Sequence, residues 1–224
     1  MSVTLADVLT SLAYRLGEDQ SPSDANEKAR RVRFINEAYR KVIIRAYWWF
    51  TEASADFNSV ANRANYDTTD GFPSDYRDMI ELRLDDKVYT YIPQSKVFGL
   101  YDSTMQIFNY DDLISNKHWY VFDNTLTLLP TPTTSGTDNI VMKYWKFPTS
   151  VTTDAGTFLI PDQFIDCLDA YAYARIAQLD TMRGDAADGL SEFNSIMEDM
   201  MVENNRRKIF NKSARVIPND FIVD

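Results

Sequence analysis

The apolar residues of this sequence recur at two different periods, and the change between them limits the folds that the chain can adopt. Near both ends the spacing is that of amphipathic helices, which we predict over residues 4–17, 24–47, 162–182 and 190–208. Between them, residues 49–158 are rich in aromatic and alternating residues and are punctuated by Pro and Gly. Two helices therefore come first, a β-rich stretch follows, and two further helices come after it.

The β-rich stretch carries local signals for individual strands and turns. We predict one strand from Trp49 to Phe57 and another over Asn139–Phe147. Between the two hairpins that we predict, residues 93–117 are expected to hold short helical pieces. Later in the chain, the segment Arg183–Gly189 is expected to break the helical pattern. The hairpins are expected to turn at two pairs of residues: Asp85-Asp86 and Asp123-Asn124.

The simplest packing of these elements is an α+β fold. It is mainly a helical bundle formed by the N- and C-terminal helices, with a β-rich insertion between the second and third helices. An extended C-terminal tail completes the expected architecture. The corresponding parts are the N-terminal helices, the insertion, the C-terminal helices and the tail: residues 1–48, 49–158, 159–208 and 209–224.

The formal net charge of -10 is unevenly distributed along the chain. Residues 24–47 hold seven Lys or Arg against three Asp or Glu, a net of +4, and residues 206–224 have a net of +3. Residues 48–205 hold ten basic against twenty-five acidic residues, a net of -15. This asymmetry favours contact with other proteins, or self-assembly in which basic segments meet acidic ones. Solvated surfaces without a partner are an equally open interpretation.

The residue types that build catalytic and metal sites are scarce. His118 and Cys167 are each the single residue of their type, so no His pair, Cys cluster or Cys/His pair is available. The seven glycines are dispersed and form no phosphate-binding loop. We therefore predict that the protein is not an enzyme and binds neither a cofactor nor a metal. Two acidic doublets occur where turns or helix starts favour Asp: Asp85-Asp86 and Asp111-Asp112.

The sequence also lacks targeting signals. The N-terminal residues include neither a basic segment nor a long apolar run, and Asp7 and Arg15 interrupt them. We expect neither a signal peptide nor a membrane span. The chain is expected to be made in a cytoplasm and used there, or in something assembled there.

Two segments allow a binding interpretation beside a structural one. The basic helix over residues 24–47 could follow nucleic-acid phosphates, and the aromatic residues 47–50 could stack on bases. Those aromatic residues are more typical of packing where the helix meets the β-rich insertion. The stripe containing Met197, Met200 and Met201 could be an adaptable binding face, although its spacing favours core packing. A nucleic-acid-binding regulator that uses the basic helix is therefore the alternative function.

Three phrases, taken together and in order, resemble a known family. The resemblance covers roughly residues 3–208 and is to the head-to-tail adaptor (connector) proteins of tailed bacteriophages. The chain is especially similar to the adaptor or tail-tubular gatekeeper type of short-tailed phages. The phrases are RFINEAYRKVIIRAYWWFTEASADF (Arg33–Phe57), GFPSDYRDMIELRL (Gly71–Leu84), and LIPDQFIDCLDAYAYARIAQLD (Leu159–Asp180) followed by AADGLSEFNSIMEDMM (Ala186–Met201).

The resemblance implies a virion structural protein of the neck. Such proteins form a ring of about twelve copies beneath the portal vertex, after DNA has been packaged. Their C-terminal segments commonly bind the portal protein, and their lower face receives the next tail or nozzle component. Genomic DNA passes through the central channel without sequence-specific binding, and no membrane is involved. An adaptor proper, a tail-tube gatekeeper and a stopper all stay open.

Two sets of residues are candidates for these contacts. An unstructured basic segment with apolar residues suits a docking arm that becomes ordered when bound. The candidate portal-binding tail consists of Arg206, Arg207, Lys208, Ile209, Phe210, Lys212, Arg215, Val216, Ile217, Phe221, Ile222 and Val223. The candidate ring contacts are Arg30, Arg31, Arg33, Arg40, Lys41, Asp166 and Asp169.

Overall fold

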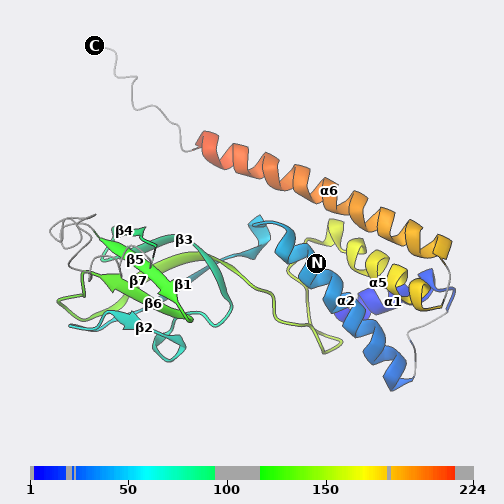
Figure 1. Cartoon of the computed structure of the whole chain (residues 1–224), viewed down its shortest axis with the longest axis horizontal. Coiled ribbons are helices and arrows are strands. Elements are labelled where there is room, and N and C mark those ends of the chain that lie inside the picture. Colours follow the sequence, from blue (N-terminus) through cyan, green and yellow to red (C-terminus); the bar gives the residue numbers. More distant parts are fainter. Residues whose placement is uncertain (1–2, 19–21, 23, 94–116, 181–182, 215–224) are drawn as a thin grey trace, which may run out of the picture. The chain divides into compact units, whose positions relative to one another are not determined.

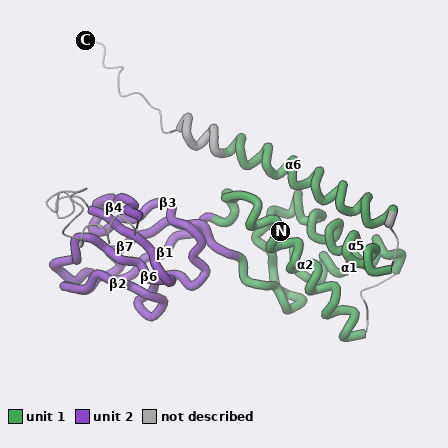
Figure 2. The backbone as a smooth tube through the Cα atoms, viewed as in Figure 1, with its two compact units in different colours: residues 1–51, 148–224 green, residues 52–147 purple. Residues whose placement is uncertain are grey.

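The computed structural model describes residues 3–18, 22, 24–93, 117–180 and 183–214 (Figure 1). The chain divides into two compact units, which Figure 2 shows in different colours. The helical unit combines residues 1–51 with residues 148–224, and the sheet unit consists of residues 52–147. The helical unit is therefore built from two stretches that are distant in sequence, whereas the sheet unit is continuous.

The helical unit is organised around one central helix. This helix, α5 (Asp166–Leu179), packs against α1 (Leu5–Arg15), α2 (Ala25–Arg45) and α6 (Arg183–Ala214). Figure 1 shows α5 between α2 and α6. In contrast, α1 and α2 make few contacts with each other. The four helices lie where the apolar spacing predicts them, and α6 is longer than predicted at both ends.

Helix α5 can take this central place because of its small residues. Alanines occupy four buried positions along it, and they let neighbouring helices approach on several sides. Gly189 of α6 completes the close approach on one side. A Cβ atom added at Gly189 would lie 3.0 Å from the carbonyl oxygen of Ala170 and 3.0 Å from Cβ of Ala174. The predicted break at Arg183–Gly189 is therefore wrong, because this glycine serves packing inside a continuous helix.

The N-termini of α1 and α2 are capped by side chains. Thr4 and Asp7 form a capping box, in which each side chain binds the backbone N–H of the other residue. Asp24 caps α2 by accepting a hydrogen bond from the backbone N–H of Glu27 at 2.8 Å. Local sequence thus determines where both helices begin.

The sheet unit is a curled, seven-stranded sheet with the strand order β1-β7-β3-β4-β5-β6-β2. All neighbouring pairs are antiparallel except β4 and β5, which are parallel. Strand β1 pairs with β7, although more than 75 residues separate them in sequence. The strands are β1 (Glu52–Ser59), β2 (Asn65–Tyr66), β3 (Tyr76–Leu84), β4 (Lys87–Tyr91), β5 (His118–Phe122), β6 (Thr125–Leu129) and β7 (Gly136–Lys146).

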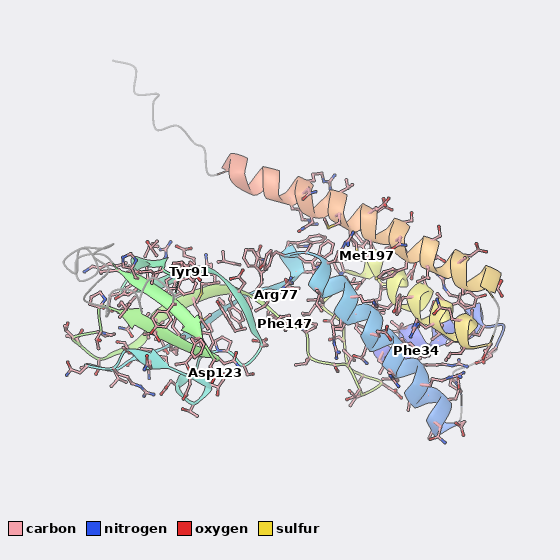
Figure 3. All side chains as sticks on the ribbon, viewed as in Figure 1. Phe34, Arg77, Tyr91, Asp123, Phe147 and Met197 are labelled. Atoms are coloured by element: carbon pink, nitrogen blue, oxygen red, sulfur yellow. The ribbon has the colours of Figure 1, made fainter. Side chains whose placement is uncertain are left out.

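Both predicted hairpins are confirmed. Strands β3 and β4 join through Asp85 and Asp86, whose φ values are 50° and 61°. Strands β5 and β6 join through Asp123 and Asn124, with φ values of 48° and 54°. Positive φ at both central residues is the requirement of a type I′ turn, which Asp and Asn tolerate better than most residues. Figure 3 labels Asp123 at the second turn.

The sheet unit has an apolar core separate from that of the helical unit. Its centre consists of fully or almost fully buried side chains on one face of the sheet and in the loops beside it. These are Phe57, Tyr66, Phe72, Leu82, Leu126, Leu128, Ile140 and Met142. The period-two pattern of the strands thus encloses a core without help from a helix among the described residues.

The predicted fold class, an α+β fold dominated by a helical bundle, is wrong. The middle of the chain forms a seven-stranded sheet with its own core, and the described residues contain four α-helices. In a bundle each helix buries one apolar stripe, whereas α5 is buried around most of its circumference and three helices pack on it.

Two further predictions concern chain segments beyond these elements. The prediction of an extended tail from Ile209 is wrong for residues 209–214, because α6 continues to Ala214. The short helical pieces expected within residues 93–117 lie outside the described residues. None of the helices in the described ranges combines the length and the apolar composition of a membrane-spanning segment.

Candidate functional site

The residues with potential for chemistry are dispersed. In the described parts of the chain, no group of three or more His, Cys, Asp or Glu side chains is placed to hold a metal ion. Cys167 lies inside the helical unit, where burial raises the pKa of its thiol. Asp85 and Asp86 form a turn, as described above, and Asp111-Asp112 lies outside the described residues. The contact residues predicted from the sequence all belong to the helical unit.

Three exposed cations lie along one side of α2. Arg33 and Arg40 are exposed and have no carboxylate partner among the described residues. Lys41 is also exposed, and its ammonium lies 5.6 Å from the ring centroid of Tyr171. Their spacing of seven and eight residues places them on one side of the helix. We call these three residues the cationic face of α2.

The other two arginines predicted as ring contacts serve the fold of the helical unit. Arg31 is buried, and its guanidinium binds Glu18 at 2.7 Å and Glu27 at 3.0 Å. Arg30 is half-buried and binds Glu27 at 2.9 Å. The buried pairing of Arg31 ties the first turns of α2 to the segment that follows α1, and it leaves Arg31 inaccessible to another copy.

The two predicted acidic contacts also differ in their surroundings. Asp166 is exposed in the first turn of α5, whereas Asp169 is only 1% exposed. Asp169 accepts a short hydrogen bond from Ser11 and lies 3.1 Å from Nε of Arg15. Arg15 also donates two hydrogen bonds, of 2.6 and 2.7 Å, to Glu192 of α6. Asp169 thus joins α5 to α1, and through Arg15 to α6, inside one chain.

Burial of Asp169 predicts a pH dependence of stability. Desolvation raises the pKa of its carboxyl above the usual value, although the Ser11 hydrogen bond and the Arg15 charge oppose this. Because the pKa of Asp169 is higher in the folded state, its carboxyl contributes fully to the free energy of unfolding at pH values below its unfolded-state pKa. This contribution is lost as pH rises through the folded-state pKa. We expect Asp169→Asn to remove this fall in the free energy of unfolding above about pH 4.

Urea denaturation of the parent and of Asp169→Asn across this pH range measures the difference. The matched control is Asp166→Asn, which changes an exposed carboxylate on the same helix. This control is expected to keep the parent pH profile. Parallel profiles for the parent and Asp169→Asn would contradict the assignment.

The aromatic residues after α2 form a structural anchor for α6. Trp48 is fully buried, its Nε1 donates to the carbonyl oxygen of Val42 at 2.7 Å, and its ring stacks on Phe50. Asn204 of α6 donates to the carbonyl oxygen of Tyr47 at 3.1 Å. The guanidinium of Arg207 lies 4.6 Å from the ring centroid of Trp49.

We expected these aromatic residues to pack against the β-rich insertion, and their contact with α6 was missed. The signal in the sequence was Asn204, a polar residue at a buried helical position. A buried amide requires a hydrogen-bond partner, and the backbone at Tyr47 supplies one.

The candidate portal-binding tail begins on the last turns of α6. Arg206 and Arg207 are exposed and both bind Glu203, at 2.6 and 2.8 Å. Lys208, Ile209, Phe210 and Lys212 belong to the helical backbone that continues to Ala214. The rest of the candidate tail lies outside the described residues: Arg215, Val216, Ile217, Phe221, Ile222 and Val223.

A groove of about 530 Å³ runs between α2 and α6. Its apolar lining comes from Phe193, Met197 and Met201, and Figure 3 labels Met197 on α6. Met200 is instead fully buried, so part of the methionine stripe packs in the core as its spacing favours. The charged and polar lining comes from Lys41, Arg45, Asn194 and Glu198.

Comparison with known protein families assigns nearly the whole chain to one family. A family model described as SU10 adaptor protein matches residues 3–217, which includes the whole sheet unit, nearly all of the helical unit and all of α6. A search of curated proteins finds no match. The matched range extends the resemblance seen in the three sequence phrases and agrees with it. The chain belongs to the SU10 adaptor protein family, a family of bacteriophage structural proteins.

Proposed function

We propose that this protein is a head-to-tail adaptor whose copies form a ring beneath the portal and link the capsid to the tail. The observation that carries this proposal is the family match over residues 3–217. Genomic DNA passes through the central channel of the ring, and a tail or nozzle component binds below it. By analogy with the connectors that the sequence resembles, the ring has about twelve copies.

The C-terminal end of α6 is the proposed portal contact. Asn204 and Arg207 anchor this helix to the residues after α2, so the direction in which it leaves the helical unit is defined. The residues after Arg207 include three Lys or Arg, two Asp and several large apolar residues, a composition suited to docking into pockets of a partner protein. The anchor therefore supports a docking segment presented at a defined place on each subunit.

Removal of residues 209–224 is expected to abolish portal binding and to leave thermal stability nearly unchanged. The truncated chain keeps Asn204 and Arg207, so the anchor of α6 is retained. Co-sedimentation with portal rings from the same source, followed by electron microscopy, measures binding. Differential scanning calorimetry measures stability.

The full-length variant Ile217→Asp with Phe221→Asp is the companion to this truncation, since it keeps the length of the chain. It is expected to lose portal binding if apolar side chains dock. Truncated protein that still adds a symmetric layer to the portal would refute the assigned contact. Full-length protein that adds no layer to the portal would refute the adaptor function.

The alternative, a nucleic-acid-binding regulator, is favoured by one observation. The cationic face of α2 has no carboxylate partner among the described residues. Phosphate binding by these cations would weaken steeply with salt, because each neutralised phosphate releases condensed counterions. A salt titration of duplex DNA binding therefore separates this function from an adaptor that lets DNA pass without binding it.

A further inference from the structure

A second unpaired charged surface lies on α6. Asp185, Asp188 and Asp199 are exposed, and none of them has a cationic partner among the described residues. The intervals of three and eleven residues place them on the same side of the helix. Glu192 lies on that side as well, but Arg15 already binds it. We call the three aspartates the acidic face of α6.

Each charged surface is accompanied by an exposed aliphatic side chain. Ile44 follows the cationic face of α2 and is 58% exposed. Val202 follows the acidic face of α6 and is 68% exposed. Covering a large aliphatic side chain removes apolar surface from water and stabilises a complex. Burial of Ile44 and of Val202 by a partner would therefore each contribute to association.

One part of the two surfaces also matches in spacing. When α2 and α6 are placed side by side in parallel, with Ile44 opposite Val202, Lys41 is opposite Asp199. In the same register Arg33 is opposite Ser191 and Asp185 is opposite Glu27, so the match is confined to the C-terminal ends of the two surfaces.

The two surfaces do not neutralise each other within one chain. Lys41 and Glu198 line the same groove between α2 and α6, but no ion pair joins the two helices in the described part of the chain, and both helices pack on α5. A contact between two different surfaces is heterologous, so each copy keeps one free surface for the next neighbour. Such a contact closes into a ring when the rotation between copies permits.

We infer that the cationic face of α2 in one copy binds the acidic face of α6 in the neighbouring copy, and that this contact builds the ring. The inference rests on the proposed adaptor function and specifies its subunit interface. It assigns the acidic side of the contact to exposed aspartates of α6 and no longer to Asp169 of α5, which is buried. The contact is expected to weaken with salt, because its charges are solvent-exposed in the free subunit.

Charge reversal tests this interface directly. One variant carries Arg40→Glu with Lys41→Glu, and a second carries Asp188→Lys with Asp199→Lys. Each variant alone brings like charges together at every contact and is expected to lose at least tenfold in assembly on portal rings. An equimolar mixture restores opposite charges at every contact and is expected to recover ring assembly.

The control variant, Lys87→Glu with Lys143→Glu, makes the same change in net charge as Arg40→Glu with Lys41→Glu, on exposed residues of the sheet unit. It is expected to assemble like the parent. Circular dichroism of each variant confirms that the fold is retained, and recovery in the mixture excludes misfolding as the cause of a loss.

Three outcomes overturn the inference. Single variants that assemble like the parent would refute the helix pairing and leave the adaptor function standing. Mixing that fails to restore assembly would also refute it. Loss of duplex DNA binding with unchanged assembly would assign the cationic face of α2 to DNA. Failure of the parent itself to add a layer to the portal would instead refute the proposed function.

Discussion

Replacing Trp48 with alanine is expected to lower the free energy of unfolding of the helical unit by about 3–5 kcal/mol. The side chain is fully buried, it stacks on Phe50 with ring centroids 5.6 Å apart, and its indole N–H binds the carbonyl oxygen of Val42. The substitution therefore creates a large cavity and removes a buried hydrogen bond. The loss should appear as faster hydrogen exchange of amides in α2 and α6, since Trp48 lies where these helices are joined.

Trp49→Ala is the matched control for this prediction. Trp49 is half-buried and contacts Arg207 at the surface, so its loss is expected to cost about 1 kcal/mol, mostly from the cation–π contact. Urea denaturation, with hydrogen exchange to separate the two units, measures both variants. Equal losses for Trp48→Ala and Trp49→Ala would contradict the anchoring role of Trp48.

Gly189→Leu is expected to destabilise the helical unit by about 2 kcal/mol or more, because it forces α5 and α6 apart. A Cβ atom alone would meet Ala170, Tyr173 and Ala174 at 3.0–3.2 Å, and the rest of a leucine side chain would meet them more closely. This loss opposes the higher helix propensity of leucine, which by itself would stabilise the helix by just under 1 kcal/mol.

Gly184→Leu makes the same chemical change in the same helix and is the control. A Cβ atom at Gly184 has no neighbour within 4 Å, so only the propensity term remains there. We expect this control to raise the free energy of unfolding by about 0.5–1 kcal/mol. Thermal denaturation followed by circular dichroism measures both variants. A stabilised Gly189→Leu variant would show that α5 and α6 are not in close contact.

The features that could be predicted from sequence are those whose cause is local. Asp85-Asp86 and Asp123-Asn124 identify two turns because only a few residue types accept positive φ at both central positions. The existence of the four helices followed from apolar spacing in the same way. Neither signal depends on a distant part of the chain.

The features that could not be predicted depend on partners distant in sequence. The pairing of β1 with β7, and of β4 with β5, turns separate strands and hairpins into one sheet. Gly189 looks like a helix break until its proximity to Ala170 is known. The fold class was therefore wrong although most of the individual elements were right.

The same reason limited the prediction of contact residues. Arg31 and Arg33 belong to the same basic helix, yet Arg31 is buried and paired with Glu18 and Glu27, whereas Arg33 is exposed. Asp169 likewise resembles Asp166 in sequence until Ser11 and Arg15 are placed beside it. Which charges are free for a partner becomes known only when the surrounding elements are in place.

The dependence of α1 and α2 on α5 has a consequence during synthesis on the ribosome. The two helices make few contacts with each other, and about 120 residues separate the end of α2 from the start of α5. At roughly 5–20 residues per second, translation of that interval takes on the order of ten seconds. The whole sheet unit is synthesised within this interval. Until α5 follows, the apolar residues of α1 and α2 lack the helix against which they pack. Host chaperones that bind nascent chains are therefore expected to engage the first 45 residues.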